Sequence, residues 1–126
     1  MIMQDISRKK LGQLKELEAK RFLQGNGLAL IEQNYRCYHG EIDLIMRDRD
    51  DIVFVEVRSR RRLDYGRAAE TVNKNKQTKL ARTAMHFLQK RDWLYKVNSR
   101  FDIIAMQKVD GEWQLEWIKN AFFSGI

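Results

Sequence analysis

Two neighbouring apolar segments of this chain each carry an acidic residue in their interior. The first is GEIDLIM (Gly40–Met46), which contains Asp43, and the second is IVFVEVR (Ile52–Arg58), which contains Glu56. A buried carboxylate without a partner is so unfavourable that it takes up a proton or acquires a cation. The two acids are therefore candidate ligands of a metal ion.

The two segments have the pattern of an antiparallel β-hairpin. Residues 41–47 and 52–58 are rich in Ile, Val, Leu and Phe, and the polar segment Asp48–Asp51 separates them. A turn centred between Arg49 and Asp50 pairs residues whose numbers add to 99. A slip by two residues or a bulge would offset these pairs.

This register predicts that Asp43 faces Glu56 and that Glu41 faces Arg58, with all four side chains on one face. The other face is then entirely apolar: Ile42, Leu44, Met46, Val53, Val55 and Val57. Opposed Cβ atoms in a ladder lie about 4.5 to 5.5 Å apart. Two opposed carboxylates can therefore reach one divalent ion at about 2.0 to 2.6 Å.

The small number of Cys and His residues restricts the kind of metal site. Cys37 is alone, which excludes an intrachain disulfide and a zinc site made of cysteines. His39 and His86 are too far apart in the sequence to indicate a histidine zinc centre. Oxygen ligands suit Mg²⁺ or Mn²⁺, so we expect Mg²⁺ (or Mn²⁺) as the cofactor.

The positive charge of the chain is concentrated in one segment. From Arg58 to Arg82 nine cations and two anions give +7, which equals the formal net charge of the whole chain. The cations are Arg58, Arg60, Arg61, Arg62, Arg67, Lys74, Lys76, Lys79 and Arg82. Such a segment directly after the acidic site favours binding of a polyanion through its phosphates. The alternative is a solvated basic helix face.

A length of 126 residues indicates one domain, 1–126, which can bury a core without disulfides. No apolar run is long enough to span a bilayer, and the N-terminus lacks the apolar stretch of a signal peptide. We expect a cytoplasmic protein with no membrane partner.

The remaining elements follow from periodicity and turn signals. We expect a helix from Ser7 to Gln24, with Ser7 as its N-cap and with Leu11, Leu14, Leu17 or Glu18, and Phe22 at helical spacing. Gly25–Gly27 ends this helix, and Leu28–Tyr35 follows as an outer strand.

The second half of the chain repeats the order of helix and strands. After a polar connection, Thr71–Lys90 is expected to form a helix whose apolar stripe is Leu80, Ala84, Phe87 and Leu88. Arg100–Gln107 and Glu112–Ile118 are predicted as strands joined at Asp110-Gly111, and Lys119–Ile126 as a short helical turn. The order predicts an α/β fold, with a central mixed sheet flanked by helices.

In the residues and segments described above, the chain resembles the YraN-like family of small bacterial proteins. That family is similar to Holliday-junction resolvases and to the PD-(D/E)xK (restriction-endonuclease-like) nuclease superfamily. The matching segments are ELEAKRFL (16–23), GEIDLI (40–45), VFVEVR (53–58), KQTKL (76–80), RFD (100–102) and WIKNAF (117–122). The resemblance implies a restriction-endonuclease-like core.

The resemblance also implies roles for individual residues. Asp43, Glu56 and the carbonyl of Val57 would bind the metal, Glu16 would complete the site, and Gln77 would touch phosphate or water. Arg58 stands where the superfamily has lysine. Arginine stays protonated and can only donate hydrogen bonds and charge, so the metal must activate the attacking water. The candidate catalytic set implied by the resemblance is Asp43, Glu56, Arg58, Glu16 and Gln77.

We therefore expect a nucleic-acid-binding protein that hydrolyses phosphodiester bonds of DNA rather than RNA, selecting branched or junction structures. Its phosphate contacts would come from the basic segment, namely Arg60, Arg61, Arg62, Arg67, Lys74, Lys76, Lys79 and Arg82. A two-fold junction would favour a homodimer. The alternatives are a catalytically inactive DNA/RNA-binding module, which the arginine at position 58 allows, and a protein-interaction scaffold.

Simpler structural explanations exist for the same acids. They could form an ion-pair network, in which Glu41 pairs with Arg58 and either Asp43 or Glu56 pairs with Arg60 or Lys76. Such a network would satisfy the charges without any metal ion.

Other polar and aromatic residues have similar alternatives. Trp93, Trp113 and Trp117 could stack on unpaired bases, but aromatics at the ends of elements usually pack in the core or at its rim. Asp102 is expected to satisfy backbone N–H groups or to pair with Arg100 rather than to act in catalysis.

Overall fold

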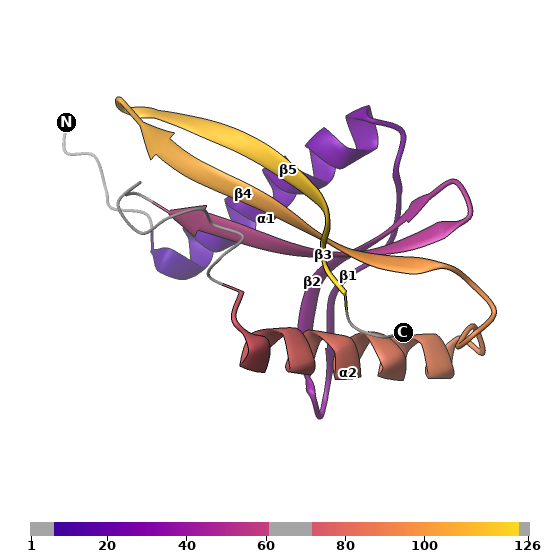
Figure 1. Ribbon diagram of the computed structural model, residues 1–126. Coiled ribbons are helices and arrows are strands. Elements are labelled where there is room, and N and C mark those ends of the chain that lie inside the picture. Colours follow the sequence, from indigo (N-terminus) through magenta and orange to yellow (C-terminus); the bar gives the residue numbers. More distant parts are fainter. Residues whose placement is uncertain (1–6, 61–71, 124–126) are drawn as a thin grey trace.

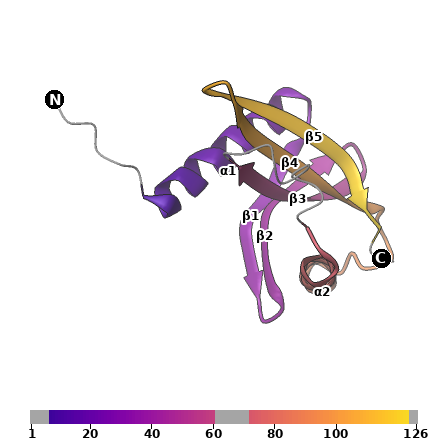
Figure 2. The same cartoon turned by 60° about the vertical axis from the view of Figure 1, so that its left-hand side comes forward.

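The computed structural model describes residues 7–60 and 72–123, which form a mixed sheet between two helices. The elements are α1 (Arg8–Gly25), β1 (Ala29–Cys37), β2 (Gly40–Asp48), β3 (Asp51–Arg60), α2 (Lys74–Lys90), β4 (Ser99–Val109) and β5 (Glu112–Phe122). The strand order is β1-β2-β3-β4-β5; β3 and β4 are parallel and the other neighbours antiparallel. The helices cover opposite faces (Figure 1, Figure 2), which confirms the predicted α/β class.

Each face of the sheet has its own apolar core. The α2 face includes Ile45, Ile52, Phe54, Phe87, Phe101 and Ile103. The α1 face includes Leu23, Leu44, Met46, Val53, Val55 and Ile104. Because alternate residues of β3 enter opposite cores, this strand is buried on both sides, as its nearly continuous apolar sequence requires. Neither described helix is long and apolar enough to cross a membrane.

Side chains cap both helices at their N-termini. The Ser7 hydroxyl accepts the N–H of Lys10 at 3.1 Å, as predicted, and the Asn73 side chain accepts the N–H of Lys76 at 2.9 Å. The predicted α2 stripe of Leu80, Ala84, Phe87 and Leu88 is buried. Thr71, the expected first residue of this helix, lies outside the described residues.

The helix predicted from Ser7 is confirmed as α1, but the apolar residues that indicated it do not all face the core. Leu14 and Phe22 are 41% and 37% exposed, whereas Lys15, Ala19 and Leu23 are buried. Ala19 allows the helix to approach the sheet closely, and the Lys15 ammonium lies 3.8 Å from the centre of the Trp113 ring. Periodicity detects apolar side chains but not a buried lysine whose ammonium lies over a tryptophan ring.

The predicted register of the β2–β3 hairpin is confirmed near its turn. Leu44 pairs with Val55 and Asp48 with Asp51, so the paired numbers add to 99. The ladder ends at Leu44 and Val55, so neither Asp43–Glu56 nor Glu41–Arg58 is a ladder pair.

Beyond the ladder, the hairpin departs from regular alternation. Ile42 packs in the α2 core rather than beside Leu44 in the α1 core, so its predicted face is wrong. The neighbouring strand contains Asn34 in a left-handed conformation at φ 54°. Glu41 forms an ion pair with Arg36 of β1, Nε to Oε2 at 2.9 Å, and this pairing replaces the predicted contact with Arg58.

The β1–β2 turn packs closely beside α2 (Figure 1). Gly40 has φ 150°, and a Cβ at this position would lie 3.2 Å from Oγ1 of Thr83. Glycine therefore allows both the backbone conformation and the close approach.

The C-terminal strand is longer than predicted. Residues 119–122 continue β5 instead of forming a helical turn, and residues 124–126 lie outside the described part of the chain. Phe122 stacks on Phe101 at 4.8 Å between ring centres. This contact holds the end of β5 against the sheet.

Candidate active site

Asp43 and Glu56 lie together where the β2–β3 ladder ends. Oδ2 of Asp43 accepts the N–H of Val57 at 2.8 Å, and Glu56 is only 6% exposed. Burial raises the pKa of Asp43 to about 8; repulsion by Glu56 acts in the same direction, and the Val57 N–H opposes it. At neutral pH the pair therefore retains a proton that two separate carboxyls would release.

Two cations contact the buried acid. Nζ of Lys76 lies 3.4 Å from Oε2 of Glu56, and Nε of Arg58 lies 3.9 Å from the same oxygen. Lys76 comes from the first turn of α2, whereas Arg58 follows Glu56 on β3. A lysine from another element thus contacts Glu56, in addition to the arginine that follows Glu56 on β3.

Asn34 connects two further acids to this region. With its amide nitrogen directed toward them, it donates to Oε1 of Glu16 at 2.9 Å and to Oε1 of Glu41 at 3.3 Å. Burial, followed by repulsion from Glu41 and Glu56, raises the pKa of Glu16. Glu16 therefore lies within electrostatic reach of Glu56, and its carboxylate is held by an amide.

The carboxylates of Asp43 and Glu56 fit a divalent ion that takes only one or two of its ligands from the protein. In the described part of the chain, no three acidic, histidine or cysteine side chains are arranged to hold a metal. Mg²⁺, however, is commonly bound through one or two carboxylates, with water and substrate phosphate as its other ligands. A divalent ion would also relieve the repulsion that raises the pKa of Asp43. Asp43 and Glu56 meet this requirement, and the Val57 carbonyl stays a predicted ligand.

The other candidate residues have varied surroundings. Nε2 of Gln77 donates to the carbonyl of Val72 at 2.9 Å, which ties down the start of α2. Among the predicted phosphate-binding residues, Lys74, Lys79 and Arg82 are exposed on α2. Arg61, Arg62 and Arg67 lie outside the described residues, as does the side chain of Arg60.

Asp102 has the structural role that was expected. Its carboxylate accepts the Arg100 Nε–H at 3.0 Å, the Trp117 indole N–H at 2.9 Å and the Asn120 N–H at 2.9 Å. Arg100 also reaches Asp48 at 2.9 Å. This network joins the β2–β3 turn to β4 and β5.

Sequence reasoning anticipated one feature of the site only as an alternative and missed another. The contact of Lys76 with Glu56 is one of the pairings of the alternative ion-pair network, although Lys76 was also predicted as a phosphate contact. Asn34 was not singled out at all. Its only signal is the tolerance of asparagine for left-handed backbone, which is shared by many turn residues.

Comparison with known proteins places this site within a bacterial family. Residues 15–106 match the "Uncharacterised protein family UPF0102", and this range includes both acids, Arg58 and Lys76. The chain belongs to the UPF0102 family. The predicted resemblance to YraN-like proteins is therefore confirmed.

Curated UPF0102 proteins match along most of their length. The protein of Pseudomonas savastanoi pv. phaseolicola is 48% identical over 120 residues, covering 94% of this chain and 97% of the relative. Those of Ectopseudomonas mendocina and Coxiella burnetii are each 46% identical over 112 residues, covering 89% of this chain and 93% and 91% of the relatives.

Proposed function

We propose that this UPF0102 protein is a metal-dependent DNA endonuclease of the cytoplasm that selects branched or junction DNA. The acid pair carries the proposal: Asp43 and Glu56 are held together at a cost in repulsion, and a lysine contacts one of them. A carboxyl group with a raised pKa, such as that of Asp43, beside charged groups is typical of catalytic sites. The resemblance to PD-(D/E)xK nucleases supports the same chemistry.

The residues suggest a division of roles. Asp43 and Glu56 would hold Mg²⁺ or Mn²⁺, which when bound supplies Lewis acidity toward water and phosphate. Lys76 and Arg58 would stabilise the charge that develops on the phosphate. Lys76 is the cation here that can also exchange a proton, because an arginine stays protonated.

The basic face of α2 supports DNA as the substrate. Lys74, Lys79 and Arg82 are exposed on the helix that carries Lys76, where they can contact backbone phosphates. Phosphate contacts carry no sequence information, so selection would depend on the shape of the DNA.

Cleavage of junction, flap and duplex DNA in Mg²⁺, Mn²⁺ or EDTA tests the proposal. We expect metal-dependent cleavage that Asp43→Ala and Glu56→Ala abolish while DNA binding persists. Lys76→Met should reduce the rate about 100-fold or more, whereas Lys76→Arg should retain part of the charge stabilisation. Lys108→Met, which removes an exposed cation from β4, is the matched control.

The opposite result is equally specific. If no substrate is cut in either metal, while both alanine variants bind DNA as the wild type does, the protein is an inactive binding module. The contacts of Lys76 and Arg58 with Glu56 would then form a structural ion-pair network.

A further inference from the structure

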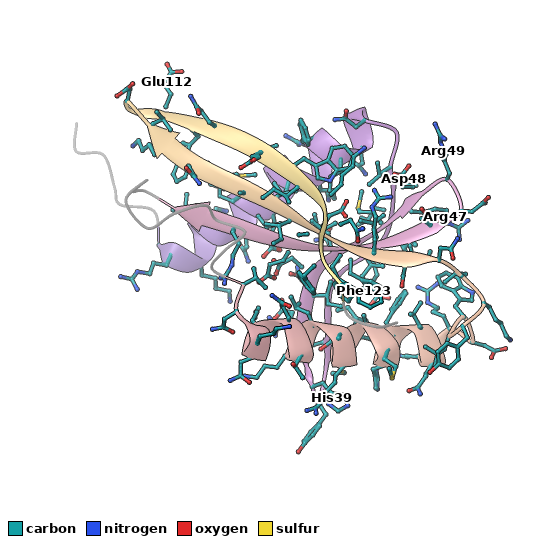
Figure 3. The ribbon with its side chains drawn as sticks, in the orientation of Figure 1. His39, Arg47, Asp48, Arg49, Glu112 and Phe123 are labelled. Carbon is teal, nitrogen blue, oxygen red and sulfur yellow. The ribbon has the colours of Figure 1, made fainter. Side chains whose placement is uncertain are left out.

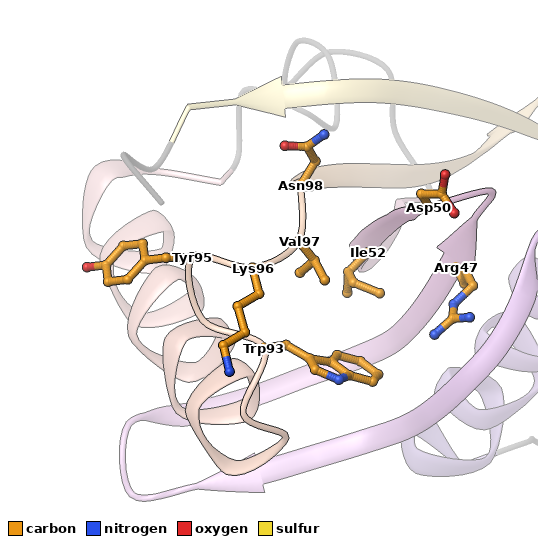
Figure 4. A pocket seen from close by; sticks show the side chains of 8 residues that line it. All are labelled: Arg47, Asp50, Ile52, Trp93, Tyr95, Lys96, Val97 and Asn98. Atoms are coloured by element: carbon orange, nitrogen blue, oxygen red, sulfur yellow. The ribbon is translucent and has the colours of Figure 1, made fainter.

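A hollow lies at the C-terminal end of α2, whereas Lys76 contacts Glu56 at its N-terminal end. It has a volume of ≈ 450 Å³, within the range of ligand pockets, and is lined by Arg47, Asp50, Ile52, Trp93, Tyr95, Lys96, Val97 and Asn98. Figure 4 shows Trp93, Ile52 and Val97 as an apolar wall, with Asn98 and Asp50 on one side. The hollow thus combines an aromatic surface with hydrogen-bonding groups and cations.

The β2–β3 hairpin supplies one edge of this hollow. Figure 3 shows Arg47 and Arg49 together at the turn end of that hairpin, far from His39 in the β1–β2 turn. Arg47 lines the hollow, whereas Arg49, at the same end of the hairpin, does not. The two arginines therefore allow a specific contact to be separated from a general effect of positive charge.

The wall of this hollow is held in place by the backbone. The N–H of Trp93 donates to the Leu88 carbonyl at 2.8 Å, and the N–H of Lys96 donates to the Trp93 carbonyl at 2.8 Å. The N–H of Ile52 donates to the Asn98 carbonyl at 2.9 Å, which joins the loop to β3. A ligand would therefore meet a preformed surface, which reduces the entropic cost of binding.

Trp93 and Arg47 provide two planar groups that lie close to one another. Cζ of Arg47 lies 5.9 Å from the centre of the Trp93 ring, and the Arg47 side chain is exposed. The Phe87 ring meets the indole edge to face, with the ring centres 6.0 Å apart, and Cζ of the exposed Arg91 lies 5.3 Å from the centre of the Trp93 ring. Because an exposed arginine can rotate outward, a flat ring can stack on Trp93 beneath the guanidinium, as unpaired bases do on aromatic and arginine planes.

The polar groups around the apolar wall match the rest of a nucleotide. Asn98 can both donate to and accept from a base edge, and Asp50 can accept from a base amino group. Lys96 and Arg47 supply positive charge for a phosphate. In Figure 4 the Tyr95 ring points away from the other side chains, so Tyr95 is not needed for this arrangement.

Exposed cations connect this hollow with the acid pair. Lys79, Arg82 and Lys90 lie on one side of α2, as their helical spacing requires. The 17 residues of α2 span about 25 Å, and Lys76 at its start contacts Glu56. One nucleic-acid strand could therefore follow the helix between the two sites.

We propose that the hollow lined by Trp93 and Arg47 binds one unpaired nucleotide, with its base on the indole and its phosphate on Arg47 and Lys96. The inference rests on the proposed function and deepens it, because it specifies that the DNA substrate has an unpaired segment next to the strand that is cut. It also accounts for an aromatic residue that the acid site does not use.

Titration with the mononucleotide dAMP tests the pocket without requiring cleavage or metal. We expect dAMP to shift the NMR resonance of the Trp93 indole N–H, and 2-deoxyribose 5-phosphate to bind about 5-fold to 150-fold more weakly. Trp93→Leu and Arg47→Ala should weaken dAMP binding, whereas Trp93→Phe should retain most of it. Arg49→Ala is the matched control, because this exposed arginine lies two residues away and does not line the pocket.

A DNA comparison extends the same test. Arg47→Ala should reduce affinity for a duplex with a single-stranded extension more than affinity for a blunt duplex. Equal affinity for dAMP and the sugar phosphate, or an equal loss of dAMP affinity in Arg47→Ala and Arg49→Ala, would overturn the proposal that this pocket binds a nucleotide. If the pocket fails this test but the wild type still cleaves DNA in a metal-dependent way, the proposed nuclease function stands. If dAMP binds as expected but the wild type does not cleave DNA, only the nuclease activity is refuted.

Discussion

Replacing Asp43 with asparagine should change how the stability of the protein depends on pH. The folded pKa of Asp43 is raised from 3.8 to about 8, mainly by burial, so between these values the folded protein holds a proton that the unfolded chain releases. The unfolding free energy of the wild type should therefore fall as the pH rises through this interval. The substituted asparagine side chain does not titrate, and its amide oxygen can still accept the Val57 N–H.

The size of the effect follows from the width of that interval. About four pH units at about 1.4 kcal/mol each give a ceiling of about 6 kcal/mol for the gain of Asp43→Asn over the wild type above pH 8. Solvent around the half-buried carboxyl reduces this value, so we expect about 2 kcal/mol. At pH 4 most of the gain should be absent.

Urea unfolding in EDTA at several pH values between 4 and 9 measures this difference directly. Asp110→Asn, which removes a carboxylate from the exposed β4–β5 turn, controls for the loss of one negative charge. Adding Mn²⁺ should stabilise the wild type more than Asp43→Asn, because a bound divalent ion needs the ionised carboxylate. Parallel stability curves for the wild type and Asp43→Asn across this pH range would refute the reasoning.

Two further predictions concern the scaffold. Arg100→Met should cost about 3 to 5 kcal/mol in urea unfolding, because it leaves the fully buried Asp102 carboxylate without its cation; a loss below about 1 kcal/mol would contradict this. Gly40→Ala should lower stability by about 1 kcal/mol or more, since φ is 150° and the new Cβ would meet Thr83; an unchanged melting temperature would show that the turn can rearrange.

The sequence allowed more of the fold to be predicted than of the candidate site. Strand alternation and the short turn determine the register from Leu44 to Asp48, and Ser7 begins α1 as its side chain suggests. These features depend on neighbours in the sequence. The buried face of α1 does not follow from its apolar spacing, because tertiary packing selected Lys15 and Ala19 over more apolar residues.

Contacts between segments that are far apart in the sequence could not be predicted from local sequence patterns. The contact between Lys76 and Glu56 requires α2 to dock at one particular position along β3. Trp93 lines a hollow only because its loop meets Ile52 and Arg47 from the β2–β3 hairpin. Residue type and spacing identified the acids, but they gave Lys76 only as one of several possible partners and did not identify Asn34.

The crossover between β3 and β4 also bears on the order in which the molecule assembles. β2 and β3 pair through a tight turn, whereas β3 pairs with the parallel β4 only after the chain has passed through α2. Short-range pairing loses less loop entropy and generally forms sooner. We therefore expect the hairpin with its two acids to form before Lys76 arrives, so that a partly folded chain carries the acids without the balancing lysine.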